Sequence, residues 1–141
     1  MKIIVCLDEL GGMMFNKRRQ SQDRVVREKI LELCGGEKLW MSPYSYKLYE
    51  EMEGENLCVE EEFLEMASQG EFCLVEDRLL KEYDEKIEEL IVFWWNRRYP
   101  TDFRLDLDLN QWESVNMDEF EGSSHEKITK EIYRKKGNEH E

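Results

Sequence analysis

A run of five apolar residues near the start of the chain, residues 3–7, restricts the fold more than any other feature. The run is short, rich in β-branched side chains and followed by Gly11 and Gly12, which predicts a buried β-strand that ends in a turn. A strand that is apolar on both faces needs cover on both faces, as in a parallel sheet between helices. We therefore expect residues 3–7 at the centre of a sheet.

Further strands and helices alternate along the chain. The expected strands are residues 38–41, 56–59 and 72–75, and the expected helices are one capped by Ser21, one over 42–51, one over 60–68 and a short one that Asp77 opens. Gly35 and Gly36 are typical of a helix end. This alternation predicts an α/β domain with a largely parallel sheet.

The last third of the chain has a different pattern. Residues 87–95 form a long apolar stretch that predicts a central strand, so that segments 3–7, 72–75 and 90–94 should lie together in the sheet interior. Segments 103–109 and 112–117 resemble antiparallel or edge strands. Residues 127–134 fit either a helix or a strand. We expect one domain over residues 1–135 and a polar tail over 136–141.

Composition limits the classes of partner and the compartment. The chain has 33 acidic and 20 basic residues, a net charge of −13, which disfavours binding to nucleic acid. No apolar run reaches the length of a membrane span, and the first residues lack the pattern of a signal peptide. The four cysteines are widely spaced, as expected of reduced thiols. These features predict a cytoplasmic protein that contacts neither nucleic acid nor membrane.

Few motifs of catalysis are present. There is no phosphate-binding glycine loop, no nucleophile elbow and no histidine-rich set for a metal, since the two histidines are His125 and His140. We therefore expect no metal site. A basic cluster, Lys17 to Arg19, interrupts the acidic chain, and it lies in a glycine-containing segment, 11–20, that we expect to be exposed and mobile.

The order of elements resembles the dihydrofolate reductase family. The best local similarities are Tyr99-Pro100, then Trp112 to Val115, then Ser123 to His125 before a final segment, at spacings similar to the family's. The resemblance implies a mixed, mostly parallel central sheet with helices on both faces and an antiparallel C-terminal return. It also implies a strand for residues 128–133.

The resemblance implies one catalytic candidate. The family places an acid at the head of its first helix, where it holds the pterin and helps to protonate it, and Asp23 is similarly placed. The usual Leu-Pro-Trp before that acid is absent, because residues 18–22 read Arg-Arg-Gln-Ser-Gln. The simpler alternative for Asp23 is a favourable acid in the first turn of a helix.

The family's two phosphate-binding motifs are altered in this chain. The Gly-Arg-x-Thr motif corresponds to residues 42–45, which read Ser42, Pro43, Tyr44 and Ser45 and contain no arginine. The Gly-Gly turn corresponds to Glu76, Asp77 and Arg78. Two like charges about 4 Å apart repel by about 1 kcal/mol even in bulk water, so a pyrophosphate is disfavoured there. We therefore expect that binding of NADPH is lost.

These observations leave three functional hypotheses. The first is a repurposed domain that binds a small anion or an acidic protein partner through Lys17, Arg18 and Arg19, with residues 42–45 and 76–78 as further candidates. The second is a divergent NADPH-dependent reductase of a pterin-like or other heterocyclic substrate, with Asp23 as the acid. The third is an acidic α/β interaction protein outside this family. Helix capping by Asp77 and a turn role for His125 are the simpler alternatives for those residues.

Overall fold

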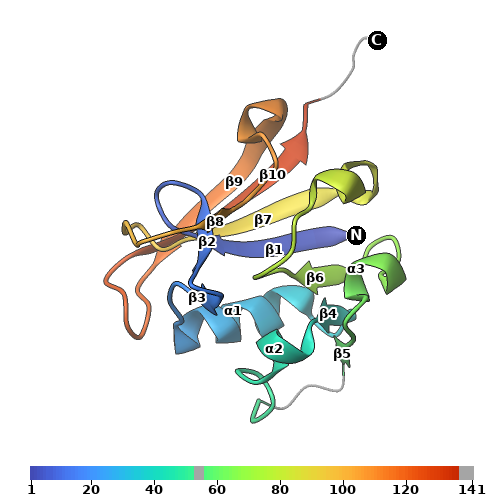
Figure 1. Ribbon diagram of the computed structural model, residues 1–141, viewed down its shortest axis with the longest axis horizontal. Coiled ribbons are helices and arrows are strands. Elements are labelled where there is room, and N and C mark those ends of the chain that lie inside the picture. The colour runs from blue at the N-terminus through green and yellow to red at the C-terminus, as the bar shows by residue number, and fades with distance from the viewer. Residues whose placement is uncertain (53–55, 137–141) are drawn as a thin grey trace.

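The computed structural model describes residues 1–52 and 56–136, and a seven-stranded sheet forms its centre. The spatial order of the strands is β5-β4-β6-β1-β7-β10-β9, which Figure 1 shows as a fan of arrows. Their bounds are β1 Lys2–Leu7, β4 Leu39–Met41, β5 Leu57–Val59, β6 Phe72–Leu74, β7 Glu89–Trp94, β9 Trp112–Phe120 and β10 Ile128–Lys135.

The interior of the sheet is built as the apolar runs predict. β1 pairs in parallel with β6 on one side, where Ile3 lies opposite Cys73, and with β7 on the other, where Ile3 lies opposite Leu90. β10 pairs antiparallel with β7 and β9 pairs antiparallel with β10, which forms the C-terminal return. The ambiguity over residues 127–134 is thus resolved in favour of a strand.

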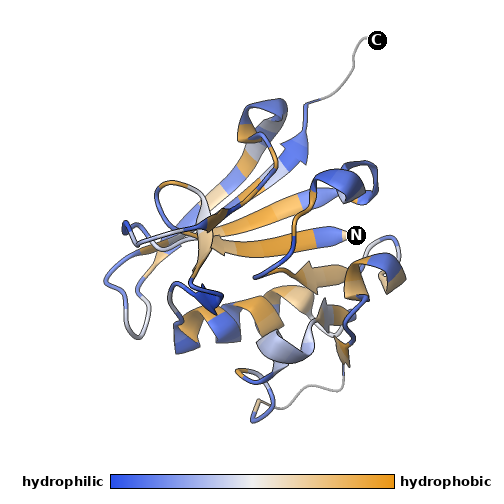
Figure 2. Ribbon diagram, in the orientation of Figure 1, coloured by the Kyte–Doolittle hydropathy of each residue, from blue (hydrophilic) through white to orange (hydrophobic). Residues whose placement is uncertain are grey.

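Two apolar cores lie on the two faces of the sheet. Helix α1 (Arg24–Cys34) and helix α2 (Pro43–Tyr46) cover one face, where Val26 and Ile30 pack against Ile4. Helix α3 (Phe63–Met66) and a 3-10 helix (Lys81–Lys86) cover the other, where Phe63 packs among Ile3, Val5 and Leu7. Figure 2 shows the hydrophobic colour concentrated in the central strands, with hydrophilic loops around them.

Helix α1 begins at a different residue from the one expected. Asp23, not Ser21, is the N-cap, and its Oδ1 accepts the N–H groups of Val25 at 2.9 Å and Val26 at 3.4 Å. A carboxylate at this position satisfies amides that have no partner within the helix. Gly35 ends the helix in the left-handed conformation (φ 57°), as its sequence position indicates.

Two other helices are shorter than the sequence indicates, and a third begins later in the chain. α2 ends at Tyr46 rather than near residue 51, and α3 covers four residues rather than the expected 60–68. No helix begins at Asp77, so capping by Asp77 is wrong. The 3-10 helix starts later, and the Asp106 carboxylate accepts the N–H groups of Leu80 at 2.7 Å and Lys81 at 2.9 Å just before and at its start.

The segment after β1 forms a β-hairpin and is not a fully exposed loop. β2 (Gly12–Phe15) pairs with β3 (Arg18–Arg19) and with β8 (Phe103–Arg104), and this small sheet lies beyond the carboxyl end of β1 (Figure 1). Met13 and Met14 are buried, whereas Phe15 is exposed. The prediction that residues 11–20 are exposed is therefore wrong for the two methionines, which pack into the core on one face of the main sheet.

The remaining expectations concern the end of the chain and the membrane. Only residues 103–104 of the expected strand 103–109 form a strand. Residues 137–141 of the expected tail lie outside the described residues, and the Lys136 amide donates to the Gln111 carbonyl at 3.2 Å. Within residues 1–52 and 56–136, no helix has the length and apolar character needed to cross a membrane.

Candidate functional site

An ion pair joins the β2–β3 hairpin to the loop that follows β6. Arg19 Nε donates to Glu76 Oε2 at 2.9 Å and Arg19 Nη2 donates to Glu76 Oε1 at 3.1 Å, a two-bond arrangement. Both side chains are mostly buried, with exposed fractions of 17% and 16%. Water screens such a pair less than it screens a surface pair, so the pair holds the hairpin against the strand ends.

The start of α2 completes this cluster. The Arg19 guanidinium lies over the Tyr44 ring, 4.3 Å from its centroid, and the Arg19 amide donates to the Tyr44 hydroxyl at 3.0 Å. Buried Ser45 donates its hydroxyl to Glu76 Oε1 at 2.7 Å, and Ser42 caps the helix by accepting the Ser45 amide at 3.2 Å. Four predicted site residues, Arg19, Tyr44, Ser45 and Glu76, therefore contact one another, and the charge of Arg19 is neutralised within the protein.

The other two residues of the basic cluster lie in solvent. Lys17 and Arg18 are exposed at the turn of the hairpin, where Asn16 and Lys17 both have positive φ (52° and 61°). In the described part of the chain neither side chain makes an ion pair within 4.0 Å. The predicted anion site is thus divided: one guanidinium is used internally and two cations remain accessible.

Asp23 is enclosed by the loop between β9 and β10. Besides capping α1, its Oδ1 accepts the amide of Ser123 at 2.9 Å, and its Oδ2 accepts the amide of Ser124 at 2.8 Å. The side chain is fully buried. Burial acts to raise the pKa of Asp23, but the hydrogen bonds from Ser123, Ser124 and His125 outweigh it and hold that pKa well below its usual range. The carboxylate is ionised and its acceptor positions are occupied by protein donors.

His125 connects Asp23 to two hydroxyl groups. Its Nδ1 lies 3.0 Å from Asp23 Oδ2, while its Nε2 lies 3.0 Å from Ser21 Oγ and 3.0 Å from the Tyr99 hydroxyl. The imidazole is buried and stacks on the Trp95 indole with 4.5 Å between ring centroids. The turn role expected for His125 describes only its place in the chain, since its side chain is the centre of a buried polar network.

Little space remains between these two clusters. The cavity lined by Cys6, Asp23, Tyr49, Glu76 and Trp95 has a volume of about 20 Å³, room for about one water molecule. Burial raises the pKa of the Cys6 thiol, with Glu76 adding to the effect, and burial likewise raises the pKa of Tyr49. Both groups are therefore neutral at pH 7. The groove between the strand ends is filled by side chains.

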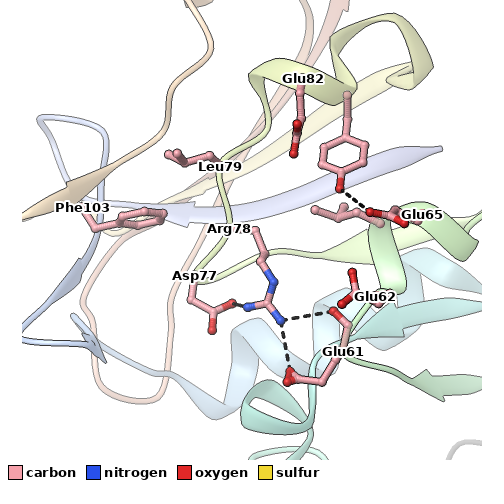
Figure 3. A pocket seen from close by; sticks show the side chains of 10 residues that line it. Glu61, Glu62, Glu65, Asp77, Arg78, Leu79, Glu82 and Phe103 are labelled. Atoms are coloured by element: carbon pink, nitrogen blue, oxygen red, sulfur yellow. Dashed lines mark hydrogen bonds and ion pairs between the residues drawn. The ribbon is translucent and has the colours of Figure 1, made fainter.

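Asp77 and Arg78 belong to a separate, open groove. Figure 3 shows Arg78 lying between Asp77 and Glu61, with Leu79 and Phe103 farther along the groove. Arg78 contacts Asp77 at 2.6 Å and Glu61 at 3.2 Å. The groove has a volume of about 360 Å³, and its remaining lining residues are Glu62, Leu64, Glu65, Glu82 and Tyr83. Its rim is acidic and Leu79, 57% exposed, presents an apolar side chain to solvent.

A second hollow continues this groove toward the hairpin. It is lined by Met14, Lys17, Asp77, Asp102 and Phe103, and it too has a volume of about 360 Å³. Asp77 and Phe103 line both hollows, so together they form one surface, here called the acidic groove. Within residues 1–52 and 56–136, no three His, Cys, Asp or Glu side chains are placed to hold a metal ion.

The sequence did not predict that Ser21 and Tyr99 both contact His125. The three residues are far apart in the chain, and no local spacing brings them together. The available signal was the pairing of a helix-opening acid with one internal histidine, which is too common a combination to identify a site. The fold alone places them together.

Comparison with known structures identifies the fold as dihydrofolate reductase-like. The chain is similar to dihydrofolate reductase from Enterococcus faecalis, solved in complex with NADP(H) and RAB-propyl, with a TM-score of 0.68 over 96% of each chain and 14% sequence identity. No protein-family model matches the sequence, and no curated protein matches it at a significant level. At this identity the likeness establishes the fold, which the sequence resemblance predicted.

Proposed function

We propose that this chain is a dihydrofolate reductase-like domain that binds a protein partner and does not use a pyridine nucleotide. The observation that most directly supports the proposal is the Arg19–Glu76 pair, which lies across the groove between the hairpin and the end of β6. A nucleotide phosphate near Glu76 would have to displace this pair and then face a carboxylate. The enclosed Asp23 likewise offers no free oxygen to a pterin.

The acidic groove supports a partner of particular chemistry. Its rim carries Glu61, Glu62, Glu65, Asp77, Glu82 and Asp102, against Lys17 and Arg78. Its floor includes the exposed Leu79 and the half-buried Phe103. Apolar contacts supply affinity and complementary charge supplies orientation and association rate, so the groove fits a segment with basic and apolar side chains. We propose a cytosolic location, which the four free cysteines support.

The anion hypothesis is retained only for Lys17 and Arg18. These exposed cations at the hairpin turn could attract a small anion or an acidic partner, whereas Arg19 is occupied by Glu76. The reductase hypothesis receives no support from the contacts of Asp23 and Glu76. The sheet order agrees with the resemblance and argues against an unrelated fold.

A peptide-binding assay tests the groove. A fluorescent peptide of lysine and leucine at helical spacing should bind, and the same peptide with glutamate for lysine should not. The triple variant Glu61→Gln/Glu65→Gln/Glu82→Gln should weaken binding by about 10-fold, if each lost pairing contributes about 0.5 kcal/mol. The control Glu32→Gln/Glu121→Gln/Glu126→Gln removes the same charge from exposed positions outside the groove. Equal weakening by both variants would mean that only net charge matters.

A calorimetric titration tests the nucleotide. We expect no binding of NADPH at concentrations up to about 1 mM, the level that corresponds to about −4.1 kcal/mol of binding free energy. Micromolar binding would overturn the proposal in favour of the reductase. Titration with inorganic phosphate, compared with a Lys17→Ala/Arg18→Ala variant, tests the anion hypothesis separately.

A further inference from the structure

Ser21, His125 and Asp23 contact one another in a row, from hydroxyl to imidazole to carboxylate. Ser21 Oγ lies 3.0 Å from His125 Nε2, and on the opposite side of the ring His125 Nδ1 lies 3.0 Å from Asp23 Oδ2. The serine precedes α1, the acid caps it, and the histidine comes from the loop before β10. This is the spatial arrangement of hydroxyl, imidazole and carboxylate that activates a serine nucleophile on unrelated folds.

The hydrogen-bonding capacities of the three groups suit that role. Asp23 is ionised and can only accept, so its contact with His125 places a proton on Nδ1. His125 Nε2 faces the hydroxyls of Ser21 and Tyr99. Stacking on Trp95 and burial fix the plane of the ring. The Tyr99 hydroxyl, 3.0 Å from Nε2 and 3.4 Å from Ser21 Oγ, is a second donor at the same point.

Ser21 is the most exposed of the three residues. It is partly exposed, whereas His125 and Asp23 are buried. The adjoining cavity of about 20 Å³ holds about one water molecule, so an acyl group can reach Ser21 only from the solvent side.

We propose that Ser21 is the nucleophile of an acyl-transfer site that hydrolyses carboxylic esters approaching from solvent. Ser21 Oγ forms a bond to the carbonyl carbon while its proton passes to His125 Nε2. The ester C–O bond then breaks, and the leaving alcohol takes that proton. Water attacks the acyl-serine by the reverse route, which releases the carboxylic acid and restores the Ser21 hydroxyl. This activity is independent of the acidic groove and of the proposed partner.

Covalent labelling of the unmodified protein provides the primary test. Diisopropyl fluorophosphate should form an Oγ–P bond with loss of fluoride, and peptide mass spectrometry should place the single adduct on Ser21. Labelling on Tyr99, on scattered residues or nowhere would overturn the proposal. Because this measurement needs no variant, it does not depend on whether a substituted protein folds.

Turnover of 4-nitrophenyl acetate provides the second test. Ser21→Ala should lower the rate on the order of 100-fold, the contribution expected of an assisted nucleophile. Ser68→Ala, an exposed serine remote from the network, should leave it unchanged. His125→Gln should lower the rate by a similar factor, because it removes the group that accepts the Ser21 proton. A Ser21→Ala protein that folds by circular dichroism and retains the full rate would contradict the proposal.

Discussion

Asp23, for which the sequence resemblance implied a catalytic role, serves the stability of the fold. Its carboxylate caps α1 and binds the two serine amides of a loop about 100 residues later. A carboxylate with this many donors is stabilised in its ionised form, and the ionised form in turn fixes the proton of His125 on Nδ1. The acid therefore contributes to both the stability of the helix end and the alignment of the network.

The stability of the protein should depend on Asp23 at low pH. The folded-state pKa of Asp23 lies below the unfolded value of about 3.9, so its contribution is complete above that value and is lost as the pH falls through the folded pKa. Asp23→Asn should cost about 2–3 kcal/mol of unfolding free energy at pH 7, because asparagine keeps a cap oxygen but loses the charged hydrogen bonds from Ser123 and Ser124. Urea titrations from pH 7 down to pH 2 measure both quantities.

Urea titrations of Asp23→Asn and wild type at each pH show whether the charge of Asp23 is responsible. Below pH 4 the difference between wild type and Asp23→Asn should shrink, because the unfolded wild-type chain takes up a proton at Asp23 that the folded state does not. A difference that stays constant over the whole range would show that Asp23 acts through shape alone. Glu28→Gln, at an exposed position of the same helix, serves as the control.

At the scale of elements, the side chain of Arg19 attaches the β2–β3 hairpin across the groove between the strand ends. Arg19 is the last residue of β3, and its guanidinium joins the hairpin to both Glu76 and Tyr44. On its other side, β2 pairs with β8, where Met14 lies opposite Phe103. The hairpin is thus attached at two points to segments distant in sequence.

A double-mutant cycle on Arg19 and Glu76 should detect this attachment. Arg19→Ala, Glu76→Gln and the double variant should give a coupling free energy of about 1–2 kcal/mol, since the pair is mostly shielded from water. The exposed pair Arg24 and Glu28, measured in the same way, should couple by about 0.3–0.5 kcal/mol. Equal coupling in the two cycles would mean that the Arg19 pair does not hold the hairpin.

The elements that sequence reasoning predicted are those with a local signal. The central strands β1, β6 and β7 are continuous apolar runs, and α1 has both an apolar stripe and Gly35 at its end. The hairpin was missed because Asn16 and Lys17 form its turn without the glycine that usually marks such a turn. The contacts of His125 were missed because its partners Ser21 and Asp23 are 104 and 102 residues away.

At the scale of the whole molecule, the net charge of −13 acts against the compact state. Like charges on a folded surface repel one another, and dissolved salt screens the repulsion. The screening length falls from about 30 Å at 0.01 M to about 8 Å at 0.15 M ionic strength. We therefore expect the thermal midpoint to rise by several degrees over that range of sodium chloride, as measured by circular dichroism.

A charge-reversal variant separates this effect from specific ion binding. Glu32→Lys, Glu121→Lys and Glu126→Lys each add two positive charges, so together they change the net charge from −13 to −7. Salt should then raise the midpoint less than in the wild type. A midpoint that falls with salt in the wild type would show that attractive pairs, such as Met1 with Glu88, outweigh the repulsion.

The central place of β1 also sets the order of events during synthesis. Ile3 pairs with Cys73, 70 residues later, and Lys2 pairs with Glu89, 87 residues later. At about 5–20 residues per second, the first strand emerges roughly 4–17 s before its second neighbour exists. Until β6 emerges, roughly 3.5–14 s after β1 at that rate, the apolar residues of β1 have no neighbouring strand of the main sheet. Closure of so long a loop also makes the sheet slow to nucleate. A nascent chain of this kind spends its first seconds as a substrate for aggregation or for a chaperone.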